Sequence, residues 1–139
     1  MEGWNAIPFD KCLIKHKVTR NNQVRSSEVK TIEKYPVVDQ GQKFISGYTD
    51  DKSKLVEDGL PYIIFGDHTR CFKYVDFPFA LGADGTKVLK PSPNSFSARF
   101  FYYAMLALNI PNRGYNRHFK LLKEKFVPLP LIPEQRRLA

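Results

Sequence analysis

Residues 96–108 have the sequence FSARFFYYAMLAL, which is almost continuously apolar and contains no glycine or proline. A stretch of this length and composition predicts an α-helix. Asn94 or Ser95 can cap its start, and Pro111 followed by Asn-Arg-Gly stops it. Because apolar side chains surround almost the whole helix, we expect it to be the central buried helix of the core.

Short strands are expected on the N-terminal side of this helix. Each combines β-branched or aromatic residues with flanking turn signals, and the segments concerned are residues 18–20, 35–38, 60–65, 69–79 and 86–89. Asp84-Gly85 predicts a tight turn before the last of these strands. No helix is expected within residues 1–40.

The segment after the long helix is expected to contain a short helix over residues 119–125 and an extended stretch over residues 126–130, which contains two prolines. Pro133-Glu134 is typical of the first turn of a further helix, with proline early in the helix and an acidic side chain beside it. The sequence stops soon afterwards. We therefore expect a helix that is truncated just after its start.

One domain is expected for a chain of 139 residues. Hydrophobic residues make up 42% of the sequence and aromatic residues 14%, enough to bury a core. We expect residues 1–132 to form the domain and residues 133–139 to be the start of the truncated helix. The expected fold class is mixed α+β, with a twisted sheet of short strands packed on the central apolar helix.

Positive charge is concentrated in the C-terminal third of the chain. The net charges of residues 1–30, 31–98 and 99–139 are +3, −1 and +6, which together make the formal +8 at pH 7. Such a polarity favours an acidic partner, and a nucleic acid over a membrane surface. Because the sequence has neither a spanning apolar run nor a signal-peptide layout, we expect a cytoplasmic protein.

The usual catalytic motifs are missing from the sequence. It contains no Asn-Pro-Pro-Tyr motif of a DNA amino-methyltransferase, no P-loop, no HExxH and no GxSxG. A metal-dependent nuclease stays open as an alternative, because Asp39 and Asp50-Asp51-Lys52 could supply carboxylates for Mg²⁺. These acids lie in what is predicted to be a surface turn, so the nuclease is the weaker interpretation.

His68 and the two cysteines are interpreted as structural. His68 lies between Asp67 and Thr69 after a predicted strand, and such a sequence can tie a loop through side-chain to backbone hydrogen bonds. No nucleophile lies near it to make a catalytic pair. Cys12 and Cys71 match no zinc spacing, so buried free thiols are expected.

The densest group of potential DNA-binding side chains lies in residues 112–120, NRGYNRHFK. Arginine can pair with guanine O6 and N7, asparagine can pair with adenine, and lysine and backbone amides can hold phosphates. Basic loops with one tyrosine are common, so this segment is weak evidence by itself. The lysines that follow, such as Lys123, are equally compatible with a solvated helix face.

Several segments together resemble the target-recognition domains of Type I restriction-modification specificity (S) subunits. They are Gly66-Asp67-His68-Thr69-Arg70, Asp76-Phe77-Pro78-Phe79, Gly82-Ala83-Asp84-Gly85, Gly114-Tyr115-Asn116-Arg117-His118-Phe119, Pro128-Leu129-Pro130 and Glu134-Gln135. Their order and spacing carry the resemblance, which covers nearly the whole chain from Trp4. Leu131 departs from the family pattern, where a second proline usually precedes the next leucine.

The resemblance implies a non-catalytic, double-stranded-DNA-binding domain that recognises one half of a bipartite target. In this family a long helix leaves the domain at the Glu-Gln position, and methyltransferase (modification) subunits dock alongside. The domain itself holds no cofactor. S-adenosylmethionine serves methylation in the modification subunits, and ATP and Mg²⁺ serve cleavage by the restriction subunit.

The resemblance also assigns roles to the basic residues. The Gly-Asp-His-Thr-Arg and Asp-Phe-Pro segments recur in the family and are interpreted as scaffold, with Arg70 and Lys73 as candidate phosphate contacts. For His118, packing and DNA binding both stay open as roles. The candidates for direct DNA contact are Arg113, Tyr115, Asn116, Arg117 and Lys120, with Lys43 as an addition.

Two alternatives remain beside the nuclease. A recognition domain of a fused Type IIG or IIB-like restriction enzyme would present the same module beside its catalytic domains. A protein-binding adaptor could instead use the segment Leu129-Pro130-Leu131-Ile132-Pro133 to dock a partner. Binding that is insensitive to salt and independent of DNA would favour the adaptor.

Overall fold

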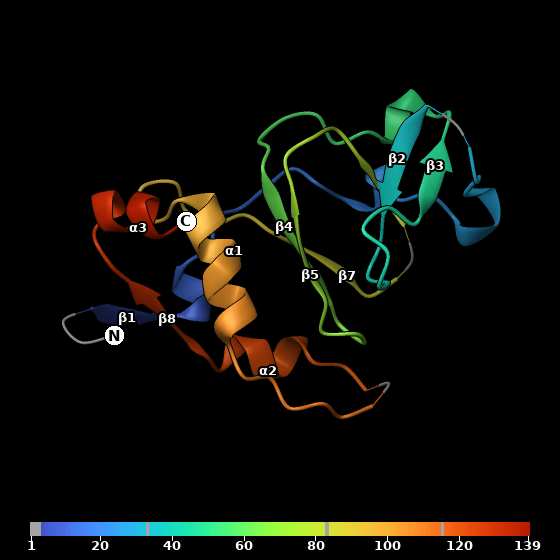
Figure 1. The fold of residues 1–139 in the computed structure, drawn as a ribbon. Helices are drawn as coiled ribbons and strands as arrows, with labels where there is room; N and C mark the ends of the chain where they lie inside the picture. Colours follow the sequence, from blue (N-terminus) through green and yellow to red (C-terminus); the bar gives the residue numbers. More distant parts are fainter. Residues whose placement is uncertain (1–3, 33, 83, 115) are drawn as a thin grey trace.

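The computed structural model describes residues 4–32, 34–82, 84–114 and 116–139. Within these residues the chain forms eight strands, three α-helices and several short 3₁₀ turns (Figure 1). The strands and helices are β1 (Asn5–Pro8), β2 (Tyr35–Val38), β3 (Gly47–Thr49), β4 (Tyr62–Gly66), β5 (Phe72–Val75), β6 (Ala80–Leu81), β7 (Thr86–Leu89), α1 (Ala98–Ala107), α2 (Phe119–Lys123), β8 (Phe126–Leu129) and α3 (Ile132–Leu138).

The central sheet has the order β5-β4-β7, with β4 paired antiparallel to both neighbours. All five residues of β4 are buried, which explains the continuous apolar run in this part of the sequence. In β5, burial alternates: Lys73 and Val75 are buried, whereas Phe72 and Tyr74 are half-buried. The Gly85 backbone has a φ of 85°, which a turn into β7 requires and glycine adopts without strain.

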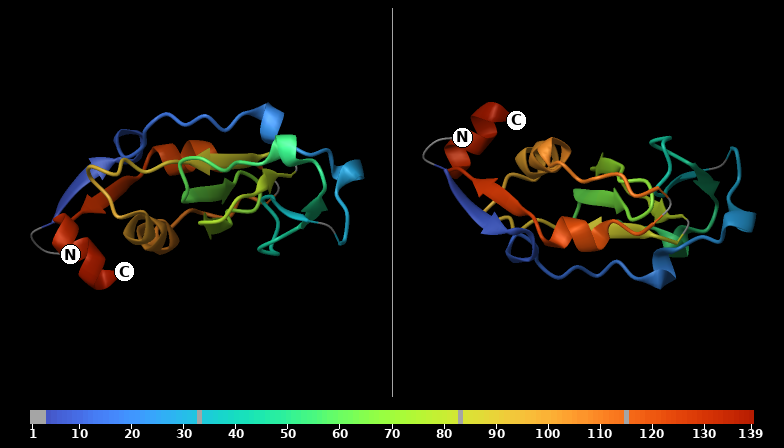
Figure 2. Two further views of the ribbon diagram at one scale, coloured as in Figure 1. Left: turned by 90° about the horizontal axis from the view of Figure 1, so that it is seen from above. Right: turned by 90° about the horizontal axis from the view of Figure 1, so that it is seen from below.

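Two smaller sheets flank the central one. The sheet with order β3-β2-β6 pairs β2 antiparallel with β3 and parallel with β6. At the other end of the molecule β1 pairs antiparallel with β8, so the two ends of the chain are joined close to α3 (Figure 1). The segment that follows β1 then runs along one side of the molecule, next to α2 and β7 (Figure 2).

Helix α1 packs on the central sheet with one face only. Phe100, Phe101, Ala104 and Met105 are buried in the main core cluster, together with residues of β4 and α2. Tyr103 and Leu106, at 48% and 50% exposed, lie outside this buried set. The expected central helix of the core is present, but it is buried on one face, and no element among the described residues covers the side of Tyr103 and Leu106.

The mixed α+β class is confirmed, although the strands divide into three small sheets. The expected strands at 35–38, 60–65, 69–79 and 86–89 correspond to β2, β4, β5 and β7, and the short helix and extended stretch after residue 118 correspond to α2 and β8. Residues 18–20 do not form a strand. Thr19 instead caps the 3₁₀ turn Arg20–Asn22. The N-cap of α1 is Ser97, not Asn94 or Ser95.

Helix α3 is fixed to the domain by one buried amide. The side chain of Gln135 is fully buried, and its Oε1 accepts a hydrogen bond of 2.8 Å from the Ser97 N–H at the start of α1. Its Nε2 donates to the carbonyls of Ser95 and Pro130, each at 2.8 Å. Because these hydrogen bonds join α3 to the start of α1 and to the segment before α3, Gln135 helps to fix the orientation of α3 on the domain.

Both cysteines are free, but their environments differ. Cys12 is buried, and burial raises the pKa of its thiol to about 12, so that it stays protonated at neutral pH. Cys71 is only partly buried, which departs from the expectation of two buried thiols. Among the described residues, no helix has the length and apolar character needed to cross a membrane.

Candidate nucleic-acid interface

Four loops meet at the end of the central sheet where β4 ends and β5 and β7 begin. They comprise residues 39–46, the β4–β5 hairpin at 66–71, the turn at 84–85 and the α1–α2 loop at 108–118. In Figure 1 the α1–α2 loop passes beside the tip of this hairpin. Hydrogen bonds from a few buried side chains hold these loops together.

Asp67 is the main link between the hairpin and the α1–α2 loop. Its side chain is buried, with the residue 1% exposed, and Oδ1 accepts hydrogen bonds from the backbone N–H groups of His118 at 2.9 Å and Phe119 at 2.7 Å. Oδ2 lies 3.4 Å from the Arg117 guanidinium. A carboxylate from another part of the chain thus caps the start of α2. The N–H of Asp67 itself donates to Gly85 O at 2.9 Å.

His118 supports the basic loop, which is the sequence segment 112–118, from the protein interior. It is fully buried, and its Nε2 accepts a hydrogen bond of 3.0 Å from the Arg113 N–H. Its Nδ1 lies 3.0 Å from the Asp67 carbonyl, an acceptor. These contacts require the neutral tautomer with the proton on Nδ1. His118 is therefore a packing residue that positions Arg113, which resolves its two possible roles in favour of structure.

Gln40 links the remaining loops. Its Oε1 accepts from the His68 N–H at 2.9 Å, its Nε2 donates to Asp84 O at 2.8 Å, and its carbonyl accepts from Thr69 Oγ1 at 2.6 Å. The Asp-His-Thr segment thus ties this region by side-chain to backbone hydrogen bonds, as expected from its sequence.

Lys73 is not placed to contact a phosphate. It is 5% exposed, and its ammonium donates to the carbonyls of Asp39 at 2.6 Å and Lys43 at 2.7 Å. Burial lowers the pKa of Lys73, and the nearby Asp39 carboxylate, at 3.8 Å, opposes that shift. The expectation of a phosphate contact is corrected because the charge of Lys73 is used to fix the loop that carries Lys43.

Arg70 also has a positioning role. Its backbone adopts a φ of 62°, which is uncommon for a residue other than glycine. Its guanidinium donates a 2.8 Å hydrogen bond to the carbonyl of Ile110. This contact ties the tip of the β4–β5 hairpin to the α1–α2 loop, so Arg70 is committed to the scaffold in this structure.

The other described candidates are exposed on these loops and on α2. They are Lys43, Arg113, Asn116, Arg117 and Lys120. Arg117 has a side chain that is 74% exposed despite its contact with Asp67. The Asn116 amide donates a hydrogen bond of 2.6 Å to Arg113 O in the same loop. Tyr115 lies outside the described residues.

Each carboxylate considered for a nuclease makes a separate contact with another residue of the protein. Asp39 lies beside Lys73, Asp50 pairs with Lys30 at 3.1 Å, and Asp51 accepts from the Ser53 N–H at 3.0 Å as the cap of a 3₁₀ turn. Among the residues that the structure describes, no group of three or more His, Cys, Asp or Glu side chains could hold a metal ion.

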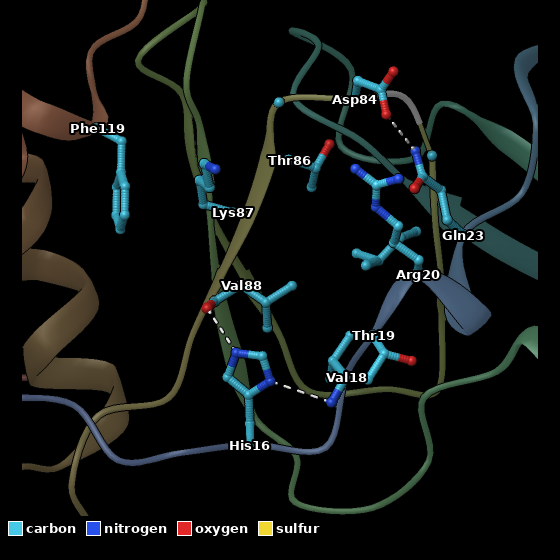
Figure 3. Close-up of a pocket in the computed structure, with 13 residues that line it drawn as sticks. His16, Val18, Thr19, Arg20, Gln23, Asp84, Thr86, Lys87, Val88 and Phe119 are labelled. Atoms are coloured by element: carbon cyan, nitrogen blue, oxygen red, sulfur yellow. Dashed lines mark hydrogen bonds between the residues drawn. The ribbon is translucent and has the colours of Figure 1, made fainter.

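One surface feature escaped the sequence analysis. A hollow of about 410 Å³ lies between residues 16–23 and β7, with Arg20, Lys87 and Phe119 among its lining residues (Figure 3). A second hollow of about 560 Å³ adjoins it, and Arg20, Gln23 and Asp84 line both. These side chains come from distant parts of the sequence, so no local motif marks the feature.

Comparisons with known proteins identify the fold. No protein-family model matches the sequence, and no curated protein matches it. Among solved structures, the chain is similar to the Type-I restriction-modification system S subunit from M. genitalium, with 20% identity and a TM-score of 0.72 over 98% of this chain and 37% of that chain. It is also similar to the HsdS subunit from Thermoanaerobacter tengcongensis, with 16% identity and a TM-score of 0.55 over 99% of this chain and 36% of that chain.

A third similar structure comes from work on complex assembly and conformational transition of the type I R-M system. It has 18% identity and a TM-score of 0.62, over 99% of this chain and 37% of that chain. The chain thus has the fold of a part of Type I specificity subunits and spans little more than a third of their length. The resemblance inferred from the sequence is confirmed at the level of the fold.

Proposed function

We propose that this chain is a DNA target-recognition domain of a Type I specificity subunit, which recognises one half of a bipartite site in double-stranded DNA. The observation that carries the proposal is the basic loop, whose residues Arg113 and His118 are hydrogen-bonded to the buried side chains of His118 and Asp67, on a fold shared with S subunits. A loop fixed before binding loses little conformational entropy when DNA docks.

The exposed side chains of this region suit DNA recognition. Arg113, Asn116 and Arg117 are the side chains that can make paired hydrogen bonds to base edges in the major groove. Lys43 and Lys120 extend the positive surface on either side and contact phosphates, which position the protein without carrying sequence information. Tyr115 stays a candidate for the same surface from the sequence.

The domain directs chemistry that other subunits perform. Methylation with S-adenosylmethionine belongs to the modification subunits, and ATP- and Mg²⁺-dependent cleavage belongs to the restriction subunit. The domain provides the sequence specificity, and α3 provides the start of the helix that connects it to the rest of the complex. The same module in a fused Type IIG or IIB-like enzyme would contact DNA in the same way.

The proposal predicts DNA binding that weakens steeply with salt. For a duplex held through about four phosphates, a plot of log Kd against log salt concentration should have a slope of about 3 to 4. Fluorescence anisotropy of the purified chain with a labelled duplex, from low to physiological salt, measures this slope. A flat titration would remove DNA as the partner and leave the adaptor interpretation.

Arg117→Ala should weaken binding to a duplex containing the recognised half-site by about tenfold, because one bidentate arginine–base contact is lost. Lys123→Ala, in which an exposed lysine of α2 is removed, should change the affinity by less than about threefold. The half-site is identified by methylation mapping of the parent complex. If Arg117→Ala weakens binding equally on every duplex, Arg117 contacts phosphate and does not recognise a base.

A further inference from the structure

The two adjoining hollows beside β7 form one open groove, which we call the β7 groove. Its walls are the segment 16–25 on one side and β7 with the turn before it on the other. Figure 3 shows Arg20 on the side of β7 that carries Thr86 and Val88, and Lys87 on the side that faces Phe119, so the two cations border the first hollow from different sides of the strand. The second hollow continues past Arg20 towards Arg25 and Lys54.

The groove exists because the segment after β1 is hydrogen-bonded to β7 and the residue after it at one end and to β6 of the neighbouring sheet at the other. At one end the Ile14 N–H donates to Lys90 O at 2.9 Å, and His16 Nε2 lies 3.1 Å from Val88 O. At the other end the Val24 N–H donates to Leu81 O at 2.7 Å. Between these points the 3₁₀ turn Arg20–Asn22 keeps the segment off the edge of β7.

The groove carries an excess of positive charge that the protein does not neutralise. Its four cationic side chains are Arg20, Arg25, Lys54 and Lys87. In the described part of the chain, none of these four forms an ion pair, and Lys87 instead lies over the Phe119 ring at 5.4 Å from its centroid. Two carboxylates line the groove, Asp84 and Glu28.

The groove is continuous with the loops of the candidate interface. Phe119 and Gly85 line its first hollow, and the same two residues are hydrogen-bonded to Asp67, through the Phe119 N–H at 2.7 Å and the Gly85 carbonyl at 2.9 Å. The next residues from Phe119 towards the N-terminus are His118 and the exposed Arg117. The lining of the groove and the basic loop are therefore joined through Asp67.

We infer that the β7 groove is a second DNA contact, which holds the sugar–phosphate backbone of the strand that flanks the recognised half-site. This inference rests on the proposed function. The cations are spread along an open, polar channel instead of converging on one point, which suits a row of phosphates better than a single compact anion. Contacts of this kind fix the register of the domain on DNA and carry no sequence information.

The first test removes groove charges. Arg20→Gln and Lys87→Gln, made singly and together, should each lower affinity about threefold to tenfold at low salt and reduce the salt slope by about one, and the double variant by about two. The loss should be the same on a half-site duplex and on a duplex of unrelated sequence. The matched control is Arg136→Gln, which removes one exposed guanidinium from α3 and should leave affinity and slope unchanged.

The second test changes a groove charge in the opposite direction. Asp84 is exposed, and its Oδ1 accepts a hydrogen bond of 3.1 Å from Gln23 Nε2, which an asparagine oxygen can also accept. Asp84→Asn should therefore keep the local structure and raise affinity for any duplex about twofold to threefold, because a like charge no longer faces the phosphates. Such a gain cannot come from misfolding.

The outcomes separate the groove from the proposed function. If the unmodified chain binds no DNA, the proposed function fails together with the groove. If the chain binds DNA with the expected slope but the Arg20, Lys87 and Asp84 variants all behave like Arg136→Gln, the groove inference alone is overturned. Losses confined to the half-site duplex would show a base contact and would overturn the assignment to backbone.

Discussion

Replacing Asp67 by alanine is expected to lower the free energy of unfolding by about 3 kcal/mol and the Tm by about 10 °C. The buried carboxylate accepts hydrogen bonds from the N–H groups of His118 and Phe119 and lies beside Arg117. Alanine leaves the Phe119 N–H without its acceptor at the start of α2, and the His118 N–H keeps only the carbonyl of residue 67. Thermal and urea denaturation followed by circular dichroism measures the loss.

Two variants control this experiment. Asp76→Ala removes an exposed carboxylate after the other end of β5 and should change stability by less than about 0.5 kcal/mol. Asp67→Asn keeps an oxygen that can accept the backbone hydrogen bonds and should be less destabilising than alanine. If Asp67→Ala unfolds at the same temperature as Asp76→Ala, Asp67 does not hold the basic loop and the argument for a rigid recognition surface is lost.

Elements with a strong local pattern were predictable from the sequence. The apolar run of β4 and the turn signal before β7 depend on neighbouring residues, so the sequence contains them. The strands β1, β3 and β6 were not predicted, since each has at most four residues, and β1 and β6 pair with strands that are distant in the sequence. Residues 18–20 have a strand-like composition, but the segment there bows away from β7 and finds no strand partner.

The candidate site also has a part that the sequence predicts and a part that only the tertiary structure shows. The basic loop at 112–118 was recognisable because its cationic, amide and aromatic residues are consecutive. Lys73 was a candidate for phosphate contact only, and its burial depends on hydrogen bonds to the loop at 39–46, which no local pattern encodes. The β7 groove was missed because Arg20 and Lys87 are distant in the sequence and border the same hollow only in the tertiary structure.

The second large effect is expected when this domain is transplanted. Residues 4–135 would replace the corresponding domain of a complete specificity subunit, with the junction after Gln135 so that the buried amide still fixes the direction of α3. Base contacts from each domain set the identity of its own half-site, and the helices that join the domains set the spacing between half-sites. Only one half-site should therefore change.

Genome-wide mapping of adenine methylation by the hybrid complex is the most direct measurement of this claim. If the proposed function is correct, the hybrid methylates a bipartite site in which one half is new. The other half and the spacer length should be those of the recipient. A hybrid that assembles stably, methylates DNA and keeps the recipient's original half-site would contradict the assignment of sequence recognition to this chain.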